Sequence, residues 1–263
     1  MRSNSIQIRA LDGIPEIQPG ESLCKEILLS LERGFPASIG SCNQAGPVHP
    51  ARGAVFVIAQ KVVSKAEGRI VELEIITPSA QARDWASQYH KDARMIEVIL
   101  REAKRIVRMD RGILIVETHH GFICANGGVD ASNAPKGTVI LLPRDPDASA
   151  QRLRVELETA LRIPIAVIIS DTFGRPWRQG LTNIALGVAG LSPFIDYRGQ
   201  VDLFGRTLHA TVLAVADELA AAAELVMGKT LGMPVALIEG FQHEAADGSG
   251  RDLIRPSDED LFR

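Results

Sequence analysis

The chain contains few cysteines, and none of them stands in a pattern that binds metal or builds a disulfide framework. The three are Cys24, Cys42 and Cys124, which are widely spaced and form no CxxC pair. An odd number of scattered cysteines is typical of a reduced protein of the cytoplasm, and it argues against a secreted disulfide scaffold or a zinc site.

A membrane signal is also missing. No uninterrupted apolar run approaches the roughly 18 residues that a membrane-spanning helix needs. The N-terminal residues Met1 to Ser5 lead into an alternating segment and not into the apolar core of a signal peptide. We therefore expect a soluble, cytoplasmic protein that does not bind a membrane.

The common nucleotide and esterase motifs are absent as well. The chain has no GxxxxGK[ST] phosphate loop, no GxGxxG next to a strand and no GxSxG nucleophile elbow. Its formal net charge of −3 lacks the basic excess of a nucleic-acid-binding protein, although a local basic pocket for a small anion remains compatible with it.

What is present is ordinary globular composition and a mixed pattern of apolar residues. The 263 residues, 46% of them hydrophobic, suffice for one large domain or two smaller ones, and no repeat or low-complexity linker divides them. Strands are predicted at residues 6–11, 54–59, 112–118, 122–125, 165–169, 208–215 and 235–238. Helices are predicted at residues 22–34, from 77 onward, and at 92–107, 148–161 and 217–227, with an irregular loop at 35–53. The pattern indicates an α/β (α+β) fold.

The most informative single stretch runs from Ile168 to Gly180. A buried strand is predicted to end at Asp171 and Thr172, followed by a glycine-punctuated loop that carries Arg175 and Arg178. An acid and a hydroxyl at the end of a strand, next to cations, suit metal and phosphate chemistry. A strand followed by a solvated turn would use similar residues, so the local pattern leaves both interpretations open.

Other polar segments extend this inventory. Lys61 and Lys65 follow a predicted strand and are natural anion ligands, although lysine-rich segments more often form solvated faces. Asp130 and Asn133 offer oxygen ligands three positions apart, and a capped turn would use the same residue types. Together the segments at 14–17, 60–65, 126–133, 171–180 and 228–232 fit a metal-dependent nucleotide site assembled from loops that are distant in the sequence.

Four blocks of sequence closely resemble the coenzyme F420-0:L-glutamate ligase family, also called the F420 gamma-glutamyl ligase family. They are QKVVSKAEGR at 60–69, GVDASN at 128–133, SDTFGRPWR at 170–178 and ADELAAAAELVMG at 216–228. The blocks occur in the order found in the family, and the resemblance extends from residue 6 to residue 262.

The resemblance implies a GTP-dependent ligase that adds L-glutamate to coenzyme F420-0, and in many members further gamma-linked glutamates, while GTP is split into GDP and phosphate. It implies a family-specific single domain over residues 1–263, made of two intertwined lobes and assembled into an entwined homodimer. Because the chain ends at Arg263, we expect no C-terminal flavin-reductase domain. The implied cations are Mg²⁺ or Mn²⁺, two per site, with K⁺ as a further candidate.

Carried over position by position, the resemblance also implies site residues. Asp130 and Asp171 are expected to ligate one divalent cation, and Thr172 is expected to contact a second. The residues expected to contact GTP are Ile14, Pro15, Glu16, Ile17, Gln60, Lys61, Lys65, Asn133, Met227, Gly228, Lys229 and Thr230.

Two positions depart from the family pattern. Gln60 and Lys61 stand where archaeal relatives can carry small hydroxyl residues, so that contact with the nucleotide is expected to differ. Lys229 stands where some relatives place an acidic or amide side chain on the second metal. A cationic lysine cannot ligate a metal, so either the second metal is held differently or Lys229 contacts phosphate.

Charge neutralisation should dominate the chemistry, because an acceptor carboxylate must attack the γ-phosphorus of GTP. The predicted catalytic residues are Asp130, Asp171, Lys65 and Arg175, and the role of Arg175 follows from its charge and not from the resemblance. Two alternatives remain open: a related ligase acting on another carboxylate acceptor, and a catalytically idle protein that binds a nucleotide or a deazaflavin.

Overall fold

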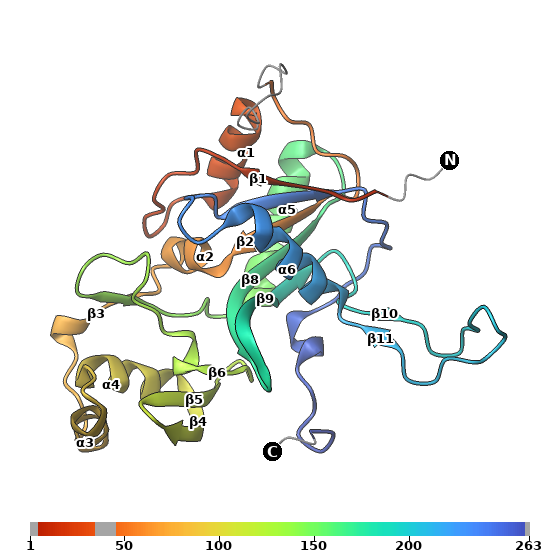
Figure 1. Cartoon of the computed structure of the whole chain (residues 1–263). Helices are drawn as coiled ribbons and strands as arrows, with labels where there is room; N and C mark the ends of the chain where they lie inside the picture. The colour runs from red at the N-terminus through yellow and green to blue at the C-terminus, as the bar shows by residue number, and fades with distance from the viewer. Residues whose placement is uncertain (1–4, 35–45, 261–263) are drawn as a thin grey trace.

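The computed structural model describes residues 5–34 and 46–260 (Figure 1). The predicted loop at 35–53 and Cys42 therefore lie partly or wholly outside the described residues. The α-helices are α1 (Leu23–Arg33), α2 (Gln60–Ala66), α3 (Ala80–Tyr89), α4 (Ala93–Glu102), α5 (Pro146–Leu161) and α6 (Val215–Met227). Short 3-10 helices are η1 (Leu73–Ile75), η2 (Asn126–Gly128) and η3 (Gly250–Leu253). None of the described helices combines the length and apolar character needed to cross a bilayer.

The strands form one larger sheet and several small ones. In chain order they are β1 (Gln7–Leu11), β2 (Val55–Ala59), β3 (Ile70–Glu72), β4 (Ala103–Asp110), β5 (Ile113–Thr118), β6 (Ile123–Ala125), β7 (Thr138–Ile140), β8 (Ala166–Arg175), β9 (Arg178–Ala189), β10 (Ile195–Asp196), β11 (Val212–Leu213) and β12 (Val235–Glu239). The larger sheet has the order β1-β12-β2-β8-β9. Within it β2 and β8 are parallel, and the other neighbours are antiparallel.

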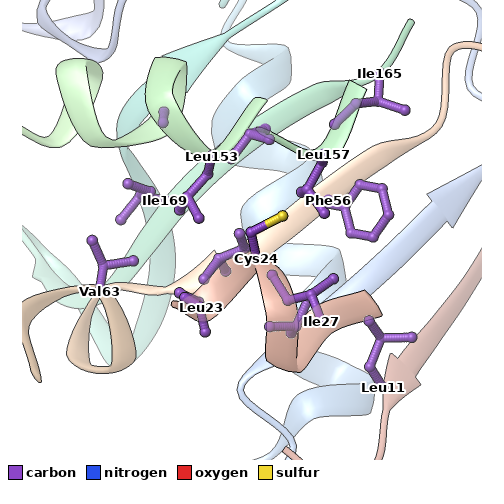
Figure 2. Packing of buried hydrophobic residues seen from close by; sticks show 14 of the residues in the cluster. Leu11, Leu23, Cys24, Ile27, Phe56, Val63, Leu153, Leu157, Ile165 and Ile169 are labelled. Carbon is purple, nitrogen blue, oxygen red and sulfur yellow. The ribbon is translucent and has the colours of Figure 1, made fainter. Parts of the chain in front are cut away.

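Helices cover both faces of this sheet, which explains why its central strands are continuous apolar runs and not alternating ones. Phe56 and Ile169 point to the face covered by α1, α2 and α5, where they pack with residues such as Leu157 (Figure 2). Their chain neighbours, such as Val57 and Ile168, point to the opposite face and pack under α6. The two-residue repeat of a strand thus supplies two separate cores.

A smaller unit with its own core is built from α3, α4 and β4–β6. Trp85, Ile99 and Val116 are buried there, in a cluster separate from those of the larger sheet. Phe122 joins the two units, because it packs edge-on against Phe173 of β8 at a centroid distance of 6.3 Å. The mixed α/β class is therefore confirmed, while the two-lobed family fold and the entwined homodimer stay predictions.

One predicted helix was too long. The helix expected at 92–107 ends at Glu102, and residues 103–110 form β4, which pairs with β5. The Ile and Val residues of 103–110 match a helical apolar face in sequence, but pairing with β5 stabilises them as a strand. Glu117 of β5 fixes that pairing through ion pairs with Lys104 and Arg105.

Smaller errors concern the ends of elements. The helix expected from residue 77 onward begins at Ala80, because the Oγ of Ser79 accepts a hydrogen bond from the Ala82 amide and caps it there. The strand expected at 208–215 shrinks to Val212–Leu213, because Val215 is already in the first turn of α6 and buried against the sheet. The hairpin expected around residues 119–121 is confirmed as the β5–β6 pair.

The expected strand end at Asp171 is wrong. β8 runs on to Arg175 and pairs with β9 throughout, with Thr172 opposite Asn183, and the chain turns only at residues 176–177. Pairing with β9 stabilises an extended backbone at residues 171–175, which in sequence looked like a glycine-containing loop. Residues 60–65 are likewise not a loop but most of α2.

Candidate active site

The start of α2 delivers Lys61 to Asp130. The Lys61 ammonium lies 2.7 Å from Oδ2 of Asp130 and 3.1 Å from the Ser132 carbonyl oxygen. Asp130 is held in place by a pair of backbone hydrogen bonds with Ile140, and its Oδ1 accepts a hydrogen bond of 2.8 Å from the Ser132 amide. Burial raises the pKa of Asp130, but the hydrogen bonds from Lys61 and Ser132 outweigh burial and lower it overall. Asp130 is therefore an ionised carboxylate.

Gly128, two residues before Asp130, allows the backbone to pack closely against Leu142. Gly128 has φ +72° and lies against Leu142, where an added Cβ would come within 2.6 Å of the leucine side chain. Only glycine combines the left-handed backbone with this close approach. The turn therefore holds Asp130 beside the larger sheet.

Asp171 lies at the centre of a group of charges. Burial raises its pKa to about 6, against the opposing effects of the Thr172 amide and the Lys61 and Lys229 ammonium groups, while the charge of Asp130 raises it further. All three charged residues are thus close enough to Asp171 to act on its titration. Lys61 is brought there by the parallel pairing of β2 with β8, which sets Ala59, the residue before α2, beside Ser170.

Four side chains form a closed polar ring next to Asp171. Thr172 donates a 2.6 Å hydrogen bond to Oδ1 of Asn183, whose Nδ2 donates to Glu224 at 3.0 Å. Lys229 completes the ring, because its ammonium donates to the Thr172 hydroxyl and lies 3.1 Å from Oε1 of Glu224. Neither Asn183 nor Glu224 is among the site residues predicted from the sequence. A buried asparagine inside an apolar strand was the available signal for the first.

Lys65 connects this site to the segment at 14–17. It follows Lys61 by one helical turn, so the two share a face of α2. Its side chain is 5% exposed, and its ammonium is ion-paired with Glu16, whose side chain is 63% exposed. Ile14 and Ile17 are buried in the core under α1, so their side chains are not available to a ligand, whereas those of Pro15 and Glu16 are.

The family model described as F420-0:Gamma-glutamyl ligase matches residues 13–240. The chain belongs to the F420-0:gamma-glutamyl ligase family. It is 43% identical to the coenzyme F420:L-glutamate ligase of Methanothermobacter thermautotrophicus over 98% of this chain and 99% of that relative. It is 47% identical to the enzyme of the same name from Methanocaldococcus jannaschii, over 80% of this chain and 85% of that relative. The Archaeoglobus fulgidus enzyme is 35% identical over 98% and 96%.

As a member of the F420-0:gamma-glutamyl ligase family, the protein is a ligase. The residues that the fold brings together include Glu16, Lys61, Lys65, Asp130, Asp171, Thr172 and Lys229. Asn133, Lys229 and Thr230 are exposed and open to a ligand, and Gly228 is the cap at the end of α6. Met227, the last residue of α6, is buried, so its side chain packs in the core.

Arg175 lies away from the group of charges around Asp171. It lies near the tip of the β8–β9 hairpin, where its guanidinium donates to the Gln179 carbonyl at 3.0 Å. Four residues of extended strand, about 13 Å, separate it from Asp171. A direct role for Arg175 beside Asp171 therefore finds no support in this geometry, although its predicted catalytic role is otherwise untested.

Gln60 is fully buried, so its side chain faces the protein and not an open site. Its Oε1 accepts a hydrogen bond of 2.9 Å from Ser64. Its Nε2, and the hydroxyl of nearby Ser170, are buried polar atoms without a partner. Such atoms are rare, and here they belong to the chain neighbours of Lys61 and Asp171, where β2 ends beside β8.

The carboxylate oxygens of the site suit a cation that is held partly by the protein and partly by the phosphates of a nucleotide. Among residues 5–34 and 46–260, no three His, Cys, Asp or Glu side chains cluster as a self-sufficient metal site. Mg²⁺ does not need one, since it is usually held by one or two carboxylates together with phosphates and water. The Lys61 ammonium already lies among three oxygens of Asp130 and Ser132, so the site attracts positive charge. Asp130 and Asp171 therefore fit a metal that is completed by phosphate.

Proposed function

We propose that this ligase joins L-glutamate to coenzyme F420-0 through an amide bond, with GTP as the energy source and Mg²⁺ or Mn²⁺ as the required cation. Further gamma-linked glutamates and a K⁺ requirement belong to the same proposal. The enzyme acts in the cytoplasm, consistent with the unpaired, buried thiols of Cys24 and Cys124.

The observation that carries the proposal is the meeting of Lys61, Asp130, Asp171 and Lys229 at one point of the fold. Residues far apart in the chain converge there as two acids and two ammonium groups. An array of both signs suits a reaction in which a polyphosphate, its metal and a carboxylate must be held together. Membership of the family supports the identity of the two substrates.

In the first step, an oxygen of the acceptor carboxylate attacks the γ-phosphorus of GTP. The bond between that phosphorus and the bridging oxygen breaks, so GDP leaves and an acyl phosphate forms. The role of Lys65 is to neutralise phosphate oxygens, and the buried stem of this lysine positions its ammonium. Glu16 then releases Lys65 to the nucleotide, which its exposed position allows.

In the second step, the glutamate amine attacks the carbonyl carbon of the acyl phosphate. The carbon–oxygen bond to phosphate breaks, inorganic phosphate leaves and the amine loses a proton to solvent or to a nearby carboxylate. Arg175, farther along the hairpin, is proposed to contact a part of the acceptor remote from the reacting carboxyl.

The cation would be held by Asp130 and Asp171, with Thr172 adjacent. When bound, it withdraws charge from the phosphate oxygens and so lowers the barrier to attack by a second anion. The remaining contribution of these residues is positional: Ser132 and Ile140 fix Asp130, and the β8–β9 pairing fixes Asp171 and Thr172.

We further propose that the enzyme is a homodimer. The β10–β11 ribbon carries a long loop that extends away from the central sheet (Figure 1). Leu203 and Phe204 at its tip are 101% and 89% exposed, and Val201 is exposed nearby. Large apolar side chains on a projecting arm favour contact with another protein surface, and a second copy of this chain is the partner that the family resemblance implies.

The test is incubation of the protein with F420-0, L-glutamate, GTP and Mg²⁺ or Mn²⁺, followed by mass analysis of the coenzyme. A gain of one or more glutamyl units, with one GDP released for each, supports the proposal. GDP release that depends on a different carboxylic acid would favour the alternative of a related ligase. Tight GTP binding with no turnover on any acceptor would favour an idle binding protein.

A further inference from the structure

Thr172, Asn183, Glu224 and Lys229 form a ring in which nearly all the side-chain polar atoms make hydrogen bonds or ion pairs within the ring. Lys229 donates to the Thr172 hydroxyl and pairs with one oxygen of Glu224 at 3.1 Å. Asn183 accepts from Thr172 and donates to the other Glu224 oxygen, at 2.6 and 3.0 Å. An ammonium group therefore occupies the position beside Thr172 at which a second metal ion would have to bind.

The fold holds Lys229 in this position from several sides. Asn183 is buried and sits directly opposite Thr172 in the β8–β9 register, and Glu224 is in the last turn of α6. Gly228 ends the helix with φ +59°, and an added Cβ there would come within 2.9 Å of Leu231. This turn directs Lys229 back toward β8.

We infer that the Lys229 ammonium replaces the second divalent cation, so that each active site takes one metal ion together with one built-in positive charge. The inference rests on the proposed function. A lysine ammonium is a compact point charge with no lone pair, so it can neutralise phosphate but cannot ligate a metal. While it lies against Thr172 and Glu224, electrostatic repulsion keeps a divalent cation out of the same oxygens.

The carboxylates of Asp130 and Asp171, in contrast, remain available to one metal ion. Among the described residues, Asp171 has no lysine or arginine within ion-pair distance, although Lys61 and Lys229 are close enough to influence its charge. Its carboxylate is therefore left for the remaining cation. Asp130 is paired with Lys61. When a metal binds Asp130, the Lys61 ammonium can still donate to the carbonyl oxygen and the hydroxyl of Ser132.

The experiment counts Mn²⁺ ions bound per chain, by loss of the electron paramagnetic resonance signal of free Mn²⁺, in the presence of a non-hydrolysable GTP analogue. We expect one ion for the natural protein and two for Lys229→Gln, whose neutral amide oxygen can join Thr172 and Glu224 as a ligand. Lys229→Arg, which keeps the charge, and Lys91→Gln, at an exposed lysine two residues before α4, should each bind one. Thermal melting checks that all the variants are folded, which the 59% exposure of the Lys229 side chain favours.

Two ions in the natural protein would overturn the inference. One ion in both the natural protein and Lys229→Gln would also overturn it, because Lys229 would then not be what excludes the second metal, and the proposed function would stand. No bound Mn²⁺ in any of the folded proteins would overturn the metal-dependent function itself, and the inference with it.

Discussion

Lys61 and Asp130 are 69 positions apart in the sequence, yet their side chains meet at 2.7 Å. Lys61 lies in the first turn of α2, which follows β2 of the larger sheet, whereas Asp130 follows η2 in the smaller unit. The ion pair therefore joins the two units at the candidate active site. Nucleotide and metal would bind where these units meet, which makes their relative position part of the catalytic geometry.

Asp171→Asn should abolish GTP-dependent ligation while the protein stays folded. Asparagine keeps the shape of the side chain but supplies no negative charge for a cation, and we expect kcat to fall at least about a hundredfold, as for loss of other electrostatic groups at an active site. Product mass and GDP release measure the loss, and circular dichroism checks the fold. Near-normal turnover would rule out the metal assignment of Asp171.

The apparent affinity for Mn²⁺ should decrease as the pH falls below about 6. Burial raises the pKa of Asp171 to about 6 in the metal-free protein, so below that pH the carboxyl is protonated and a proton must leave before a cation can bind. The decrease should approach about tenfold per pH unit below the pKa. Titrations between pH 5 and 7.5 measure it, and Asp171→Asn serves as the control that should bind weakly with little pH dependence of its own.

Lys65→Met should weaken the binding of a GTP analogue with little effect on stability. The substitution removes a buried ammonium, and the partner that it leaves, Glu16, is exposed to water. A hydrogen bond to a charged group contributes about 1.5–3 kcal/mol, so we expect a loss of roughly ten- to a hundredfold in affinity by calorimetry. Lys91→Met is the matched control on an exposed lysine, and equal affinities for the two variants would contradict a nucleotide role for Lys65.

Phe204→Asp should convert the proposed dimer into a monomer with unchanged melting of the folded chain. Phe204 is 89% exposed at the tip of the β10–β11 arm, so a charge there disturbs a contact between chains and not the core. Light scattering after size-exclusion chromatography gives the mass of each species. Ile75→Asp, at an exposed apolar position of the smaller unit, should leave the mass unchanged; a dimeric Phe204→Asp protein would place the interface elsewhere.

Glu97→Gln should destabilise the smaller unit more at neutral pH than at low pH. A hydrogen bond from Ser79, followed by one from Arg101, lowers the pKa of Glu97 to about 2, so its stabilising contribution is present above the unfolded pKa of about 4.3 and is lost as the pH falls toward 2. The loss in the free energy of unfolding should be about 1–2 kcal/mol at pH 7. Denaturant unfolding at pH 7 and pH 2.5 tests whether the difference becomes smaller, and an equal difference at the two pH values would contradict the prediction.

Much of the fold could be predicted from local sequence, and the errors in the predicted secondary structure have a common cause. Continuous apolar runs predicted β2, β8 and β12, and capping residues predicted α1 and α5 within a few residues. Residues 103–110 and 171–175 were misassigned because distant strands pair with them. Pairing with β5 and with β9 stabilises an extended backbone there, and no local pattern contains that partner.

The sequence by itself determined the chemistry available to this protein: the acids at 130 and 171, the lysines at 61, 65 and 229, and the family to which they belong. Only the tertiary structure decided which of these groups meet. It joins Lys61 to Asp130, closes the ring of Lys229 with Glu224, and leaves Arg175 at a hairpin tip. Spatial contacts depend on strand pairing and on burial of both faces of a sheet, which are properties of the whole chain and not of any short segment.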